Sequence, residues 1–144
     1  MENTIALKLV NKEKRSAGEE IIATLRNAEQ NNGKTLFTFG QSVDLRRWKD
    51  QLEYFIATTK NGKIALIARV IDFNDRAKNP EAEPNLDEFP QVPPHEADDK
   101  NTWFALSEVR AIQIGEGDFS NDEGRDLLDL IGERSSRAYV SYSA

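Results

Sequence analysis

The segment Leu45-Arg46-Arg47-Trp48-Lys49 places three cationic side chains next to an indole ring. Arginine and lysine can hold phosphate groups, and tryptophan can stack on a nucleobase. This segment is therefore the part of the chain most typical of nucleic-acid binding. An alternative is one turn of a surface helix in which Leu45 and Trp48 face the core.

Arg69 lies within the segment Ile64 to Ile71, which is otherwise apolar. Burying an unpaired cation costs several kcal/mol, so Arg69 must pair with a carboxylate, reach solvent or face a ligand pocket. Pairing with a structural carboxylate is the most common of these outcomes.

Aromatic residues supply further candidates. Trp103 follows an acidic stretch and could line a pocket with Trp48, Phe37, Phe39 and Tyr54. Aromatic residues in strands more often pack in a core, so a binding role requires at least two of them exposed in one cleft. The candidate ligand-binding residues are Phe39, Ser42, Arg46, Arg47, Trp48, Lys49, Tyr54, Arg69 and Trp103.

The residue types needed for catalysis are scarce. The chain has no cysteine, and its one histidine, His95, follows two prolines without a Gly-x-Ser-x-Gly motif elsewhere. The segment 115–120 contains carboxylates that would repel a phosphate. Asp72 and Asp75 could share a metal ion, but no nuclease-type Glu-x-Lys follows them. We therefore expect no catalytic residue, no metal ligand, no cofactor and no enzymatic activity.

The charge is distributed unevenly along the chain. The net charge is −6, which argues against a general nucleic-acid binder. Residues 34–78 nevertheless carry nine basic and five acidic side chains, whereas residues 79–144 carry five basic and fifteen acidic ones. This asymmetry predicts one surface that attracts anions and another that repels them, unless the fold interleaves the two segments.

Length and hydropathy predict one domain spanning residues 1–144. The sequence has no run of about 18 apolar residues, so we expect no contact with a membrane. The first residues, Met1 to Thr4, lack the apolar core of a signal peptide, which favours a cytoplasmic location.

Local patterns predict the secondary structure of the N-terminal half. Residues 4–11 alternate as a strand, and Ser16 and Glu19 form a capping box for a helix that ends at Asn32-Gly33. We expect a strand at 34–40 and a short helix at 42–51. Two strands, 52–59 and 63–73, flank Asn61-Gly62 as a hairpin in which both turn residues adopt positive φ.

The C-terminal half begins with a proline-rich acidic loop at about 75–101, which contains all five prolines. Such a composition contributes little to a core, so we expect deletion of 80–94 to preserve the fold. A strand is predicted at 102–106, and residues 109–114 either continue it or form a second strand after it. A second capping box at Ser120 predicts a helix through Ile131, and residues 137–143 predict an edge strand.

This order of elements does not alternate as in a parallel βαβ protein. It predicts an α+β fold with a small, curled, mostly antiparallel β-sheet or open barrel and two flanking helices.

The hairpin from Leu52 to Val70 resembles the central hairpin of the PUA-like superfamily, especially its EVE and ASCH members. Phe39-Gly40-Gln41-Ser42 with Trp48, and Trp103-Phe104 downstream, are similar to the aromatic residues that line the pocket in those domains. The resemblance covers about residues 34–112. It implies a small curled barrel that binds nucleic acid, often at a modified base.

Three functional hypotheses follow. The first is a DNA- or RNA-binding domain that uses a basic and aromatic surface. The second is an acidic inhibitor or interaction module that binds a basic protein through residues such as Asp98, Asp99, Asp122 and Glu123. The third is a small-ligand binder that uses the same pocket.

Overall fold

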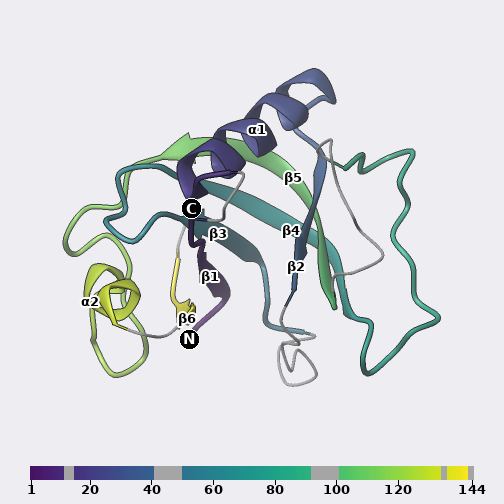
Figure 1. Cartoon of the computed structure of the whole chain (residues 1–144). Helices are drawn as coiled ribbons and strands as arrows, with labels where there is room; N and C mark the ends of the chain where they lie inside the picture. Colours follow the sequence, from purple (N-terminus) through teal and green to yellow (C-terminus); the bar gives the residue numbers. More distant parts are fainter. Residues whose placement is uncertain (12–14, 41–49, 92–100, 134–135, 143–144) are drawn as a thin grey trace.

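The computed structural model describes residues 1–11, 15–40, 50–91, 101–133 and 136–142. It contains one six-stranded open sheet with the strand order β2-β5-β4-β3-β1-β6 (Figure 1). All neighbouring strands are antiparallel except β1 and β3. This confirms the predicted α+β fold with a curled, mostly antiparallel sheet and two helices. The elements are β1 Thr4–Lys8, α1 Ala17–Gln30, β2 Thr35–Phe39, β3 Tyr54–Thr58, β4 Ala65–Asp75, β5 Thr102–Ile112, α2 Leu127–Gly132 and β6 Arg137–Val140.

The N-cap Ser16 and the left-handed residues predicted at the end of α1 are confirmed, but the Glu19 carboxylate accepts from the Ser16 hydroxyl rather than from a backbone amide. The Ser16 hydroxyl accepts a hydrogen bond from the Glu19 amide at 3.1 Å and donates to the Glu19 carboxylate at 3.0 Å. At the other end, Asn32 and Gly33 adopt φ values of 59° and 80°. These caps satisfy backbone groups that the helix itself leaves unpaired. Most of the predicted short helix at 42–51 lies outside the described residues.

The β3–β4 hairpin is also confirmed, and its turn differs from the prediction in one respect. Gly62 has a φ of 74°, but Asn61 is not among the residues with positive φ. Instead, the Asn61 side-chain oxygen accepts hydrogen bonds from the Lys63 amide and the Thr59 hydroxyl. Asn61 thus stabilises the turn through its side chain rather than through a left-handed backbone.

The two faces of the sheet are covered differently. One face packs continuously beneath α1, where Phe55, Leu66 and Phe104 join Ile21 of the helix in the main core. The opposite face carries two smaller clusters. One includes Ile56, Ile67, Phe119, Leu127 and Ile131 near α2, and the other consists of Leu36, Phe89, Trp103 and Ala105.

Part of the proline-rich loop contributes to the second small cluster. Phe89 is 5% exposed and packs with Leu36 and Trp103. The Pro90 carbonyl accepts hydrogen bonds from the Leu36 amide and the Asn27 side chain. The expectation that this segment adds little to the core is therefore wrong, because one aromatic residue anchors an otherwise polar loop.

The predicted helix start at Ser120 is wrong, since α2 begins at Leu127 with Asp126 as its N-cap. The Asn121 side chain accepts hydrogen bonds from the amides of Glu123 and Arg125, which holds this segment in a turn. Such local side-chain bonds compete with helix formation. The predicted C-terminal edge strand is confirmed as β6. Within the described ranges, no helix has the length and apolarity to cross a membrane.

Candidate functional site

The structure places the predicted site residues in different surroundings. Phe39 is half-buried against the core beneath α1. Trp103 is 2% exposed, and its indole N–H donates to the Ala82 carbonyl at 3.3 Å. The Trp103 ring therefore belongs to the core, as strand aromatics usually do, because the Phe89 segment covers it. The predicted residues Ser42, Arg46, Arg47, Trp48 and Lys49 lie outside the described residues.

Tyr54 and Arg69 are brought together on one face of the sheet. They lie opposite each other on β3 and β4, and the Arg69 guanidinium carbon is 5.9 Å from the centre of the Tyr54 ring. Arg69 is exposed. In the described part of the chain, no carboxylate lies within ion-pair distance of it. The expected pairing with a structural carboxylate is therefore not seen there, and Arg69 instead reaches solvent beside an aromatic ring.

Two residues that the sequence analysis missed complete this site. Arg110 on β5 lies opposite Ile67 of β4, and it donates a hydrogen bond to the Tyr142 hydroxyl at 2.7 Å. The Tyr142 ring meets the Tyr54 ring edge-on, with centroids 4.8 Å apart and an angle of 85°. The residues Tyr54, Arg69, Arg110 and Tyr142, which we call the tyrosine–arginine groove, line a depression of about 270 Å³ together with Ile67, Ala68 and Glu108.

A bulge in β5 determines which residue lies opposite Arg69. Ile67 pairs with Arg110, but Arg69 pairs with Ser107, so β5 has one extra residue between these positions. Glu108 lies in this bulge with a φ of 52°. Directly opposite residues interact most strongly across a sheet. The bulge puts Ser107 rather than Glu108 directly opposite Arg69, and Arg69 and Glu108 form no ion pair although both line the groove.

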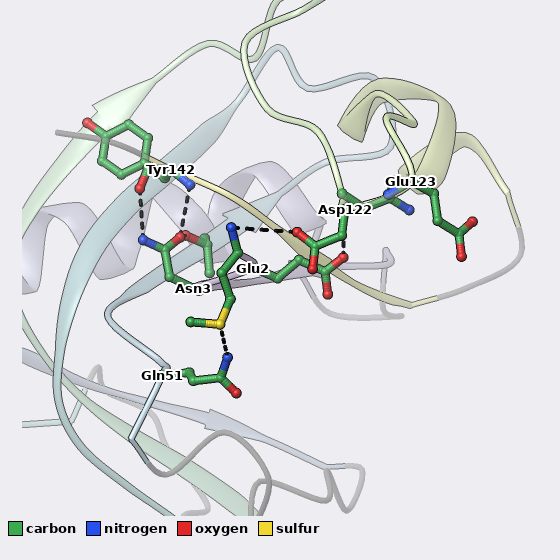
Figure 2. Close-up of polar contacts among 9 residues, drawn as sticks. Glu2, Asn3, Gln51, Asp122, Glu123 and Tyr142 are labelled. Atoms are coloured by element: carbon green, nitrogen blue, oxygen red, sulfur yellow. Dashed lines mark hydrogen bonds and ion pairs between the residues drawn. The ribbon is translucent and has the colours of Figure 1, made fainter.

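Asn3 holds both tyrosines in place. Its side chain bonds the Tyr142 backbone twice, accepting from the amide at 2.9 Å and donating to the carbonyl at 2.8 Å (Figure 2). Its main-chain carbonyl accepts a hydrogen bond from the Tyr54 amide at 3.1 Å. The Asn3 side chain thus extends the β1–β6 ladder by one step and fixes Tyr142 beside Tyr54.

Several carboxylates contact the N-terminal segment or the loop that precedes α2, whereas Glu108 is the acidic residue that lines the groove. The Glu2 carboxylate accepts a hydrogen bond from the Asp122 amide (Figure 2). The Glu53 carboxylate accepts one from the Asn3 side chain. Asp118 precedes Phe119, whose ring lies 5.5 Å from that of Tyr142. The Asp118 carboxylate accepts a hydrogen bond from the Gly115 amide, and the Asp122 carboxylate forms an ion pair with the N-terminal ammonium group at 3.8 Å. Among the described residues, the charged side chains that line the groove are therefore Arg69, Arg110 and Glu108.

The loop and helix at 115–133, which we call the acidic lobe, carry seven carboxylates and one basic residue, Arg125. Arg125 forms an ion pair with Glu133. The hydrogen bond that Arg125 donates to the Glu133 carboxylate, together with the negative charge of that carboxylate, raises the pKa of the Arg125 guanidinium. Arg125 is therefore paired within the acidic lobe. The remaining carboxylates give this lobe a large negative charge.

A larger cleft of about 700 Å³ follows β4 beyond the end of β3. Its wall includes Asp72 and Asp75, which the sequence analysis considered as metal ligands. The Asp72 carboxylate accepts from the Phe73 amide, and the Asp75 carboxylate accepts from the Ala77 amide, so both stabilise local backbone. Over the described ranges, no group of three or more histidine, cysteine or acidic residues is arranged to hold a metal ion.

The chain matches no protein-family model, and neither a curated protein nor a solved structure is significantly similar to it. The resemblance to PUA-like domains therefore stays a prediction, and the site geometry has to carry the functional argument.

Proposed function

We propose that this protein is a non-enzymatic nucleic-acid-binding domain that holds its ligand in the tyrosine–arginine groove. The observation that carries the proposal is the pair of exposed arginines, Arg69 and Arg110, beside two tyrosines on an open sheet face. Neither arginine has an ion-pair partner among the described side chains. Guanidinium groups contact phosphates, and tyrosine rings stack on bases.

The shape of the groove supports a polymeric ligand. Pockets that enclose small molecules usually measure about 300–1,000 Å³. At about 270 Å³ the groove is smaller than that, and it is open to solvent along the sheet. Such a surface suits one part of a longer chain rather than a whole small molecule.

The test is a titration of labelled oligonucleotides followed by fluorescence anisotropy at several salt concentrations. We expect Arg69→Ala with Arg110→Ala to weaken binding and to lower the salt slope, because fewer counterions are released per complex. The matched control is Arg26→Ala, since Arg26 is an exposed arginine on α1, which covers the other face. Equal salt slopes for the wild type and the double variant would contradict the proposal.

A second candidate function rests on the acidic lobe. Seven carboxylates against one arginine give it a field that would attract a basic protein. Two residues named for this role, Asp98 and Asp99, lie outside the described residues, whereas Asp122 and Glu123 lie in the lobe. If this function is the correct one, Asp122→Lys with Glu123→Lys abolishes a protein contact, and the arginine substitutions in the groove leave that contact unchanged.

A further inference from the structure

Glu108 is a carboxylate in a groove whose other charged lining residues, within the described part of the chain, are cations. It lines the tyrosine–arginine groove together with Arg69 and Arg110 and is itself exposed. Elsewhere on the sheet, the Asp72 carboxylate accepts a hydrogen bond from a neighbouring amide. Across the residues that the structure describes, the Glu108 carboxylate has neither such a bond nor an ion-pair partner. A negative charge weakens the attraction of the groove for phosphate, so Glu108 suits a different part of the ligand.

The bulge in β5 holds the backbone of Glu108 in a strained conformation. Its φ of 52° lies in the left-handed region, which residues other than glycine rarely adopt. The next residue anchors the bulge, because the Val109 amide donates a hydrogen bond to the carbonyl of Gly33, just beyond the end of α1, at 3.2 Å. Strained residues persist where the surrounding structure holds them, and they are concentrated at functional sites. The Glu108 side chain is thus carried by an anchored strand, which positions a binding group more accurately than a loop does.

The register of the sheet places Glu108 across the groove from Tyr54. Tyr54 pairs with Arg69, and Arg69 pairs with Ser107, the residue before Glu108. Because neighbouring strands are about 4.8 Å apart, the backbones of β3 and β5 are separated by about 10 Å at this level. A base stacked on the Tyr54 ring can therefore extend its edge toward β5 and the Glu108 carboxylate, while its phosphates lie near the arginines.

We propose that Glu108 selects guanine at one position of a single-stranded nucleic acid. This inference rests on the proposed nucleic-acid function and names the base that the groove prefers. An ionised carboxylate accepts hydrogen bonds through both of its oxygens and donates none. The Watson–Crick edge of guanine carries two adjacent donors, N1–H and an N2–H, which match these two oxygens in a bidentate, charge-assisted contact.

The other bases match this carboxylate less well. On the same edge, adenine and cytosine each offer one amino donor next to an acceptor nitrogen. Uracil and thymine offer one N–H donor between two carbonyl oxygens. An acceptor that faces a carboxylate oxygen is repelled by it and leaves one hydrogen bond unmade, which lowers the affinity for these bases relative to guanine.

Glu108→Gln tests this pairing because it replaces one acceptor with a donor in a side chain of nearly the same shape. The amide then presents one donor and one acceptor, which is the pattern that glutamine uses to bind adenine. We expect the variant to lose the preference for guanine and to bind adenine at least as tightly. The matched control is Glu29→Gln, which removes an exposed carboxylate from α1, on the other face of the sheet.

The experiment measures fluorescence anisotropy with labelled thymidine oligomers of about ten nucleotides that carry guanine, adenine, hypoxanthine or thymine at one central position. A single guanine avoids the self-association of guanine-rich strands. We expect the wild type and Glu29→Gln to bind the guanine oligomer about tenfold more tightly than the thymine oligomer, as one bidentate contact allows. Hypoxanthine lacks the amino group of guanine, so its oligomer should lose most of that preference.

The possible outcomes separate this inference from the proposed function. Equal affinities of the wild type for all four oligomers overturn the selection of guanine alone. A Glu108→Gln variant that retains the preference for guanine overturns it too. The same holds if this variant binds every oligomer more tightly by one common factor, because Glu108 then acts only by lowering the positive charge of the groove. A wild type that binds none of the oligomers at low salt overturns the proposed function as well.

Discussion

The two ends of one sheet face carry aromatic residues that have opposite roles. At one end, Phe89 covers Trp103, which is 2% exposed and donates its indole hydrogen bond to a loop carbonyl. Near the other end, Tyr54 and Tyr142 stay half-buried beside two exposed arginines. The difference lies in the loop that crosses the sheet rather than in the aromatic residues. The surface at Tyr54 and Tyr142 stays open because the covering segments stop before it.

The largest effect is expected from removing the Phe89 side chain that covers Trp103. Phe89→Ala leaves a cavity over Trp103, and we expect a loss of about 3 kcal/mol in the free energy of unfolding, as is usual for a buried phenylalanine. Urea denaturation measures this, with Leu86→Ala as the control, because Leu86 is in the same loop but 50% exposed. Similar midpoints for the two variants would mean that Phe89 does not anchor the loop.

Near α2, the backbone at Gly62 packs closely against Ile114 and Leu128. A Cβ atom there would lie 2.9 Å from a Leu128 methyl carbon and 3.1 Å from the Ile114 Cβ, in a residue with a φ of 74°. We expect Gly62→Ala to cost about 2 kcal/mol, from backbone strain and overpacking together.

Gly117→Ala separates these two causes. Gly117 has a φ of 84°, but nothing lies within 4 Å of its added Cβ. We therefore expect a smaller loss of stability, of about 1 kcal/mol, from strain alone. Equal losses in the two alanine variants would show that the contacts with Leu128 and Ile114 do not matter.

The two kinds of aromatic residue can be distinguished by pairing a binding assay with a stability assay. Tyr54→Leu removes a stacking surface, so we expect oligonucleotide binding to weaken by about 1.5 kcal/mol with little change in stability. Trp103→Phe removes a buried hydrogen bond and volume, so we expect lower stability with unchanged binding by the folded fraction. A reversal of these two results would assign ligand binding to Trp103.

Much of the fold was predictable because local patterns determine it. The capping residues of α1, the β3–β4 hairpin and the alternation in β6 each act over a few residues. The two errors of this kind, at Asn61 and Ser120, arose where a side chain bonds nearby amides and replaces the expected backbone arrangement. Such competition depends on geometry that residue types alone do not define.

The site was less predictable because it depends on strand register. Tyr54 and Arg69 were named from their sequence context, and the hairpin pairing joins them. Arg110 and Tyr142 come from β5 and from the end of β6, so their position beside Tyr54 follows only from the order of the sheet. The alternation Ala138, Val140, Tyr142 placed these residues on one face, but it did not indicate which residues that face would meet.

An effect as small as that of Gly117→Ala is expected where Asn3 positions Tyr142 in the groove. Asn3→Ala removes both side-chain bonds to the Tyr142 backbone but retains the main-chain carbonyl that accepts from the Tyr54 amide. We therefore expect this substitution to weaken oligonucleotide binding by about 1 kcal/mol, the net value of one or two hydrogen bonds. Its effect should match that of Tyr142→Ala rather than that of Tyr54→Leu.

A double-mutant cycle separates positioning from general destabilisation. If Asn3 acts through Tyr142, the variant with both Asn3→Ala and Tyr142→Ala binds no more weakly than Tyr142→Ala alone, because the ring that Asn3 positions is already absent. In the cycle with Tyr54→Leu, the two losses should add, since the Tyr54 amide keeps its partner in the Asn3 main chain. Additive losses in both cycles would mean that Asn3 stabilises the sheet without fixing Tyr142, and the groove would then owe its shape to the strand ladder itself.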